Sequence, residues 1–373
     1  MRISNPIRHA LIASIALAAL ASCGGSSQMA SMPLAQTGAV SQSVQAPAFQ
    51  NGRFHNILAM HSGIVSRQRV TTPSFMDPRA VGKPLLFVSY GDPIDIYLQG
   101  GKNKLVGQIA GADGVDLATD TAGNLYSANE TYSTSSVTVY APPYTNGPKL
   151  TLPGGTGFFG VAVSRQGTVA VAGCTIQSGS QCEWGVVFYA AGSTTPCATV
   201  LVDQAAFVAL NYAAFDGKEN LYIDTAGSST QAAVIGKIDG ACHAKKAMTL
   251  TTTNTFQYAG SIKVSKAGRI AILTAPSDFS VATIYSYDLP KGGRLGSPVA
   301  TTPLPGAASS YAGTFAIQAG GRRIWVGQEN VGPSSTPGAS EFAYPTGGAP
   351  EQTVMGTPGT LTVGIAVTPP LVP

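Results

Sequence analysis

The feature that most constrains this chain is a unit that returns along most of its length. In residues 114–126, two apolar stretches flank a turn containing Gly123 and Asn124, the pattern of a strand, a tight turn and a second strand. The starts of successive units lie 46 to 53 residues apart, a repeat length typical of β-propeller blades. The other copies are 160–171, 211–223, 260–272 and 313–326, and the first half of a copy closes the chain at 364–368.

Each full repeat also supplies a third and a fourth apolar stretch of strand length. The predicted third strands are 137–140, 185–189, 233–238, 283–287 and 341–344, and the predicted fourth strands are 149–152, 198–202, 247–251, 299–304 and 352–355. Gly is abundant, with 44 residues, and charged residues make up only 11% of the chain, which suits many short strands joined by turns. We therefore predict an all-β fold, a six-bladed β-propeller of four-stranded antiparallel blades.

The two ends of the repeat region complement one another. Residues 85–90, 94–98 and 105–109 provide a second, third and fourth strand without a first, and 364–368 provides a first strand without the rest. Together they make a sixth blade, so the C-terminal strand is expected to close the ring by joining the N-terminal three-strand blade. Closure removes the bare strand edges that an open array would leave. An unclosed β-solenoid and a two-domain β-sandwich remain the alternatives.

The N-terminal 83 residues lack the repeat and have the composition of an export and anchoring segment. Residues 1–22 combine Arg2 and Arg8 with an apolar run, as a secretory signal peptide does. We interpret 23–50 as a lipidated Cys23 followed by a flexible tether, 51–83 as an N-terminal arm, and 84–373 as the propeller. The expected location is the bacterial cell envelope, lipid-anchored at the outer membrane and facing the periplasm or the cell surface.

The sequence around Cys23 and the turns of the repeat resemble known families. Residues 20–23, Leu-Ala-Ser-Cys, are similar to the bacterial lipobox, and Gly24 after the cysteine implies the outer membrane. The turns 120–126 and 216–222 resemble those of NHL-type and SMP-30-like six-bladed propellers. The runs 75–89 and 342–369 resemble uncharacterised bacterial lipoprotein propellers. These resemblances imply a fold more strongly than an activity.

Four cysteines remain besides Cys23, which suggests two disulfides in an exported protein. Cys174 and Cys182 flank one loop between a second and a third strand, and Cys197 and Cys242 both fall between third and fourth strands of successive blades. We therefore predict the pairs Cys174 with Cys182 and Cys197 with Cys242, among three connectivities. The spacings do not match a zinc site.

Apart from Asp116, which lies on a predicted first strand, the candidate ligand-binding residues fall in the loops expected to meet over one face of the channel. The aromatic candidates could stack on a sugar or another flat ligand, or wedge between blades as core. The polar candidates could bind a cation or hydroxyl groups, or be solvated loop polarity. The aromatic candidates are Phe159, Phe207, Tyr212, Phe256, Tyr258 and Tyr311, and the polar ones are Asp92, Asp116, Asn129, Glu130, Asp224, Gln328 and Glu329.

Asp116 is the candidate that departs most from its counterparts. Placed against the other copies of the unit, it matches Ala162, Ala213, Ser261, Thr314 and Ala366, so it is a polar outlier at a position otherwise small or weakly polar.

We expect a ligand- or protein-binding or scaffolding module without catalysis, because the sequence has no recognisable nucleophile motif and no histidine where a channel base would lie. The net charge of +4 falls to about +2 without the signal peptide, so we expect no nucleic-acid partner. The expected partners are the membrane, through the lipid anchor, and an unknown envelope protein or glycan, with no cofactor. The alternative, implied by the SMP-30-like resemblance, is a metal-dependent hydrolase, lactonase or lyase with calcium on residues such as Glu130 and Asp224.

Overall fold

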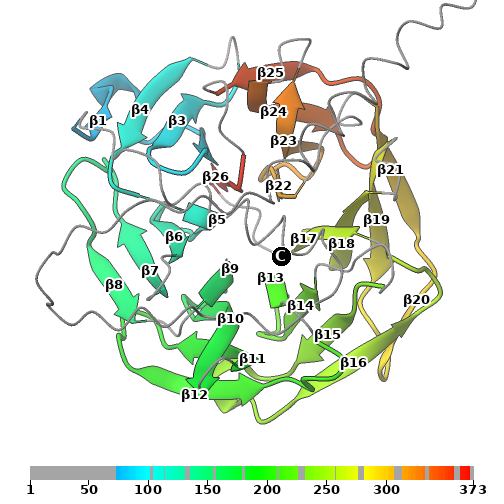
Figure 1. The fold of residues 1–373 in the computed structure, drawn as a ribbon. Helices are drawn as coiled ribbons and strands as arrows, with labels where there is room; N and C mark the ends of the chain where they lie inside the picture. The colour runs from blue at the N-terminus through cyan, green and yellow to red at the C-terminus, as the bar shows by residue number, and fades with distance from the viewer. Residues whose placement is uncertain are drawn as a thin grey trace, which may run out of the picture. The chain divides into compact units, whose positions relative to one another are not determined.

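The computed structural model describes residues 73–100, 104–112, 114–130, 135–153, 157–178, 181–207, 210–225, 232–256, 258–275, 281–305, 313–331, 336–356 and 362–369. Within them six antiparallel sheets are arranged around a centre as the blades of a propeller (Figure 1). The predicted fold class is therefore confirmed. The signal peptide, Cys23, the tether and the arm up to residue 72 lie outside the described residues.

The blades follow the chain in order, and each is numbered here by its place in that order. Blade 1 consists of β26 (Gly364–Thr368), β2 (Leu85–Ser89), β3 (Ile94–Leu98) and β4 (Leu105–Ile109), with β1 (Phe75–Met76) added outside. Blade 2 consists of β5 (Gly114–Thr119), β6 (Leu125–Glu130), β7 (Ser135–Tyr140) and β8 (Leu150–Pro153). Blade 3 consists of β9 (Gly157–Val163), β10 (Val169–Ser178), β11 (Gln181–Tyr189) and β12 (Pro196–Leu201).

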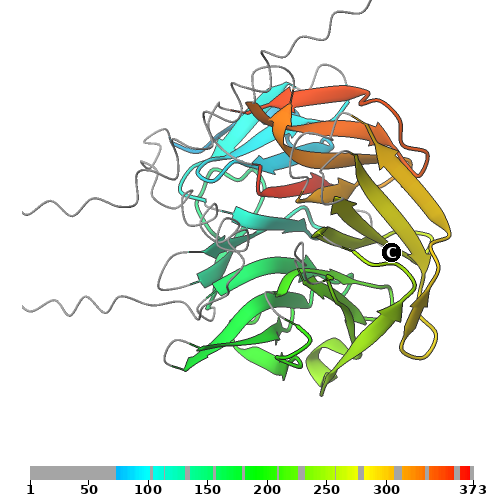
Figure 2. The same cartoon turned by 45° about the vertical axis from the view of Figure 1, so that its right-hand side comes forward.

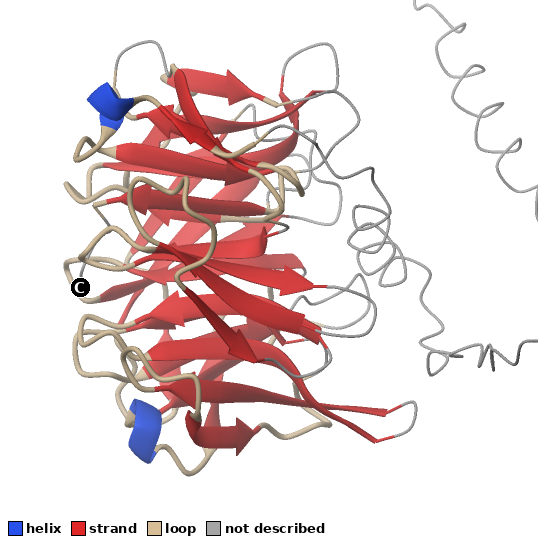
Figure 3. Ribbon diagram, turned by 90° about the vertical axis from the view of Figure 1, so that its left-hand side faces the viewer, coloured by secondary structure: helices blue, strands red, loops and turns tan. Residues whose placement is uncertain are grey.

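The second half of the ring has the same plan. Blade 4 consists of β13 (Leu210–Phe215), β14 (Leu221–Thr225), β15 (Ile235–Ile238) and β16 (Ala247–Thr252), with β20 (Arg294–Gly296) added outside. Blade 5 consists of β17 (Tyr258–Val264), β18 (Arg269–Ala275), β19 (Ala282–Asp288) and β21 (Ala300–Leu304). Blade 6 consists of β22 (Phe315–Ile317), β23 (Arg323–Val331), β24 (Thr336–Ala343) and β25 (Gln352–Met355). Two 3-10 helices, η2 (Pro78–Ala80) and η3 (Ala241–His243), lie on the same side of the ring (Figure 3).

The ring is closed by strands from both ends of the repeat region, as the sequence predicts. Strand β26 pairs antiparallel with β2 over its whole length, from Gly364 opposite Ser89 to Thr368 opposite Leu85. The amide of Leu85 also donates to the hydroxyl of Thr368. Figures 1 and 2 show the red C-terminal strand beside the cyan strands of blade 1. All five residues of β26 are buried, so closure contributes core as well as hydrogen bonds.

Two hairpin turns are held by the same aspartate motif. One oxygen of Asp120 accepts from the amides of Ala122 and Asn124, and the other from the Asn124 side chain and the Tyr126 hydroxyl. Asp216 makes the equivalent four bonds in blade 4. Asx-type turns of this kind fix the first hairpin of a blade. The resemblance in these turns to other propellers therefore reflects scaffold chemistry.

Three local features depart from a simple four-strand repeat. Strand β1 adds to the outer edge of blade 1 beside β4, and β20 adds in parallel to the outer edge of blade 4 beside β16. First-strand pairings are interrupted by register shifts, such as that between Gly114 and Asp116. Neither addition has the alternating apolar pattern by which strands are recognised in a sequence.

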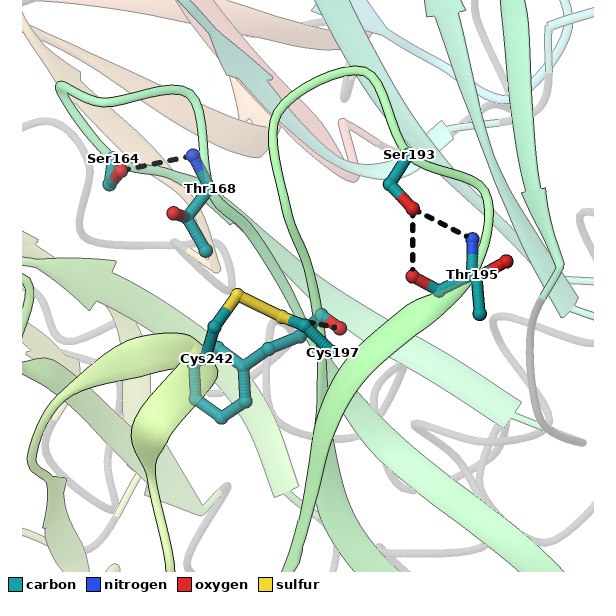
Figure 4. The surroundings of a disulfide bond; sticks show 7 residues. Ser164, Thr168, Ser193, Thr195, Cys197 and Cys242 are labelled. Atoms are coloured by element: carbon teal, nitrogen blue, oxygen red, sulfur yellow. Dashed lines mark hydrogen bonds between the residues drawn. A yellow bond between two sulfur atoms is a disulfide. The ribbon is translucent and has the colours of Figure 1, made fainter.

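A disulfide links Cys197 on β12 to Cys242 on η3, which joins blade 3 to blade 4 (Figure 4). This pair is the one predicted from the positions of the two cysteines in successive repeats. Cys174 is also disulfide-bonded. The side chain of Cys182 lies outside the described part of the chain, so the pairing of Cys174 with Cys182 stays a prediction.

Candidate functional site: the central channel

The innermost strands place one residue from each blade at the same level of the central channel. Counting back two residues from the first residue of each inner turn identifies the residue in five blades. Blade 1 has no inner turn, so its residue is identified from strand pairing. Ala366 pairs with Phe87 on the second strand of blade 1, and Ala118 pairs with Tyr126 on the second strand of blade 2. The amide-to-carbonyl bonds that define the turns join Asp120 to Asn124, Ser164 to Thr168, Asp216 to Asn220, Ser265 to Arg269 and Gln318 to Arg323. The six residues are Ala118, Ala162, Ala214, Lys263, Ala316 and Ala366.

At this level the channel is lined by five small alanine side chains and by one charged side chain, that of Lys263. A cavity of about 120 Å³ lies here, lined by the six residues and their neighbours on the innermost strands. Among the described residues that line it, Lys263 has the only charged side chain, and Thr119 has the only other polar one. The hydroxyl of Thr119 is already bonded to the carbonyl of Val367, at 2.6 Å. Among the described side chains of the cavity wall, the polar group offered to a ligand is therefore the ammonium group of Lys263.

Lys263 was not among the candidates from the sequence, although a signal for it existed. When the repeats are aligned by their turns, Lys263 is the one long charged residue at a position where the other five blades have alanine. Alignment by strand starts hides this, because the starts are separated from the turns by different numbers of residues. For the same reason, three of the five counterparts assigned to Asp116 from the sequence are wrong. Aligned by the turns, the counterparts are Gly160, Tyr212, Ser261, Thr314 and Gly364.

Asp116 lies one level further from the inner turns and links two blades. Its side chain is fully buried, and one carboxylate oxygen accepts from the amide of Val161 on the next innermost strand, at 3.0 Å. Ser261, at the same level in blade 5, uses its hydroxyl in the same way to accept from the amide of Phe315 in blade 6. The second oxygen of Asp116 has no hydrogen-bond partner among the described residues. Asp116 is thus engaged in the contact between blades 2 and 3.

Asp224 is a second fully buried carboxyl near the channel. It lies on the second strand of blade 4, and one oxygen accepts from the amide of Tyr212 on the first strand, at 3.2 Å. Its other oxygen has no partner within the residues that the structure describes. The bond crosses the register shift between Leu210 and Tyr212, where the regular ladder is interrupted. Asp224 therefore accepts from a backbone amide at the point where the pairing of the two strands is irregular.

Burial dominates the electrostatics of the two carboxyls. It raises the pKa of Asp116 and raises the pKa of Asp224 well above its usual range, because a charged carboxylate is poorly solvated inside the protein. The positive charge of Lys263 lowers both pKa values in part, and the negative charge of Asp116 raises that of Asp224. Lys263 in blade 5 therefore acts electrostatically on carboxyls from blades 2 and 4.

These raised pKa values predict an unusual dependence of stability on pH. Because the folded state holds protons that the unfolded state releases, the stabilisation is fully present below the unfolded pKa of about 3.9. It is lost as the pH rises through the folded pKa values, so the free energy of unfolding should fall toward neutral pH. The fall is about 1.4 kcal/mol for each tenfold difference in proton affinity between the folded and unfolded states. Urea unfolding of the Asp116→Asn/Asp224→Asn double variant at several pH values should show a flatter profile than wild type.

The control for this experiment is Asp288→Asn, which changes an exposed carboxyl and should leave the pH profile as it is. A double variant with the same pH profile as the wild type would contradict the assignment of raised pKa values to Asp116 and Asp224.

The described aromatic candidates are packed between blades. Phe207 is 1% exposed, lies in the core between blades 3 and 4, and fills the space beside Gly236. Phe256 is 1% exposed, and its ring lies 6.1 Å from that of Tyr287 in the core between blades 4 and 5. Tyr212 belongs to the same core. The side chains of Phe159, Tyr258 and Tyr311 lie outside the described part of the chain.

Apart from Asp116 and Asp224, which interact electrostatically with each other, the described polar candidates are bonded to residues of their own surroundings. The Asn129 side chain accepts from the Ser127 hydroxyl and donates to that of Thr138, and Gln328 accepts from Ser340. Asp92 accepts from the amide of Gly111. The side chains of Glu130 and Glu329 are not among those that the structure describes.

The described channel residues do not fit a divalent cation. Asp116 and Asp224 each have an unbonded oxygen, but neither residue lines the cavity, and Lys263 brings a positive charge to it. No group of three His, Cys, Asp or Glu side chains able to hold a metal occurs in the described ranges. A calcium ion prefers six or more oxygen ligands, which these residues do not supply.

Comparison with known proteins gives structural likeness alone. The chain matches no family model and no curated protein sequence. It is similar to a protein of unknown function from Bacteroides caccae (TM-score 0.53, 11% identity, 76% of this chain and 99% of the other). It is also similar to a chain of a nidogen/laminin complex (TM-score 0.56, 12% identity, 76% and 98%). TolB from Acinetobacter baumannii is a third structure of this kind (TM-score 0.54, 11% identity, 76% and 66%).

At these identities the likeness establishes the propeller fold and nothing further. This chain spans slightly less than two thirds of the length of the TolB chain. In the part of the chain that the structure describes, no helix is long and apolar enough to cross a membrane.

Proposed function

We propose that this protein is a non-catalytic propeller of the bacterial cell envelope that binds a protein or glycan partner. The observation that carries the proposal is that the described side chains best suited to chemistry hold the ring together. Asp116 bonds the amide of the next blade, and Asp224 bonds an amide at a register shift. Carboxyls that hold such contacts are poorly placed to act on a substrate, because moving them would break these hydrogen bonds inside the ring.

The attachment to the envelope rests on the N-terminal sequence. The basic start, the apolar run and the lipobox-like residues before Cys23 support export and lipidation of that cysteine. The uncharged, small-residue stretch that follows supports a flexible tether. The disulfide between Cys197 and Cys242 is consistent with an oxidising compartment.

The outer edges of five of the six blades favour a partner bound at a face of the ring. The edges of blades 1 and 4 are covered by β1 and β20. The outermost strands β8, β12 and β21 each contain a proline, namely Pro153, Pro196 and Pro303. Proline lacks an amide donor and protects an edge against strand addition. Loops on a rigid ring are therefore the better binding surface. The similarity to a chain of a nidogen/laminin complex supports a protein partner.

The test is capture of a partner by the tagged full chain after crosslinking in intact cells. We expect one envelope protein, or a defined glycan, to be enriched over the Cys23→Ser variant, which is made without a lipid anchor and so meets the partner less often. Turnover of a lactone or ester by the purified protein, dependent on an added divalent metal, would overturn the proposal in favour of the hydrolase alternative. So would capture of the same proteins by an unrelated propeller with the same tag and anchor.

A further inference from the structure

The level of the channel that holds Lys263 has the properties of a small ligand site. The cavity there measures about 120 Å³. An apolar cavity of about 150 Å³ accommodates benzene, so this one has room for roughly five non-hydrogen atoms. Five of the six residues at this level are alanines, which line the cavity and also pack against the cores between blades.

The charge of the cavity wall selects an anion. Lys263 is partly buried, and no described residue forms a hydrogen bond or an ion pair with its ammonium group. The nearby negative groups, Asp116 and Asp224, reach neither solvent nor the cavity, since both are fully buried and neither lines it. A cationic ligand in the cavity would therefore be repelled by the positive charge of Lys263. An anion could replace the water that otherwise satisfies the ammonium donors.

The rest of the wall selects an anion with an apolar body. Apart from Lys263 and the already bonded Thr119, the described lining is alanine, valine, leucine, isoleucine and phenylalanine. Inorganic phosphate would have several oxygens without donors in such a site, which is costly. A carboxylate has two oxygens on one end, and an alkyl chain on the other end can pack against the alanines.

We propose that the channel binds a short-chain monocarboxylate, with its carboxylate on the Lys263 ammonium group and its alkyl part within the ring of Ala118, Ala162, Ala214, Ala316 and Ala366. Propionate, with five non-hydrogen atoms, has the size that the cavity accepts. The site is separate from the proposed contact with an envelope partner, so either proposal can fail while the other holds.

Titration calorimetry of the purified full chain with propionate tests the proposal. Lys263→Met should weaken binding by about tenfold or more, because a hydrogen bond to a charged group contributes roughly 1.5–3 kcal/mol. Ala162→Leu keeps the lysine but fills the cavity, and it should also weaken binding. Lys266→Met, three residues further along in an exposed turn, is the matched control and should bind as wild type does.

Titrations with other small molecules test whether the site selects a negative charge and an alkyl chain. Butyrate should bind at least as tightly as acetate, and propylamine and inorganic phosphate should bind more weakly than propionate. Equal binding of propionate by wild type and by folded Lys263→Met would overturn the proposal. So would an absence of propionate binding to the folded wild type, or phosphate binding that is tighter than propionate binding. If Lys263→Met does not fold, Ala162→Leu and Lys263→Gln provide the same comparison.

Discussion

Removal of residues 364–373 is expected to destabilise the propeller by about 5 kcal/mol or more, because β26 carries two large aliphatic side chains worth roughly 1.5–3 kcal/mol each when buried. These are Ile365 and Val367, both in the core between blades 6 and 1. The deletion also leaves the edge of β2 unpaired along its full length. The loss is comparable to the whole stability of a typical domain. Thermal and urea unfolding should therefore show a strongly lowered midpoint or no cooperative transition.

A variant that lacks only residues 370–373 is the control, since it retains all of β26. It should unfold at the wild-type midpoint. A wild-type midpoint in the larger deletion would mean that the ring does not depend on its closing strand.

Loss of the disulfide between Cys197 and Cys242 is the second large effect that we expect. The bond closes a loop across two blades, with a sequence separation of 45. In the chain-entropy model, a loop of this size gives about 4 kcal/mol through its restriction of the unfolded state. The Cys197→Ser/Cys242→Ser double variant should lose stability of this order in urea unfolding at neutral pH.

Thr199→Ser is a matched control on the same strand, at a position two residues from Cys197. It should change the free energy of unfolding by a few tenths of a kcal/mol at most, as substitutions away from the core generally do. If the double variant were as stable as this control, the link between blades 3 and 4 would have no role in stability.

The fold could be predicted from the sequence because its signals are local and repeated. Blades 2 to 6 each begin with two strands around a glycine-containing turn, and the half-repeat at 364–368 identifies the closing strand of blade 1. The strand additions β1 and β20 could not be predicted, because they are only two and three residues long and have no alternating pattern. Their formation depends on an open blade edge that exists only after the blade has folded.

The channel site was harder to predict because first strands contain irregularities. The pairing shifts between Gly114 and Asp116 in blade 2 and between Ala259 and Ile262 in blade 5. A β-bulge changes the number of residues between a strand start and its turn, so counting from the start assigns the wrong counterparts. The turns keep a constant geometry and give the correct level, at which Lys263 stands out. The burial of Asp116 and Asp224 depends on packing between distant segments, which no local pattern encodes.

Partner capture by the Asp116→Asn/Asp224→Asn variant tests most directly the claim that these carboxyls serve the scaffold of a binding protein. Asparagine keeps a carbonyl oxygen that can accept from the amides of Val161 and Tyr212, and it removes the ionisable group. The measurement is the enrichment of the crosslinked envelope partner relative to wild type, in protein shown to be folded. We predict equal enrichment. Loss of capture by the folded double variant, or loss of a metal-dependent hydrolytic activity that the wild type possesses, would contradict this account.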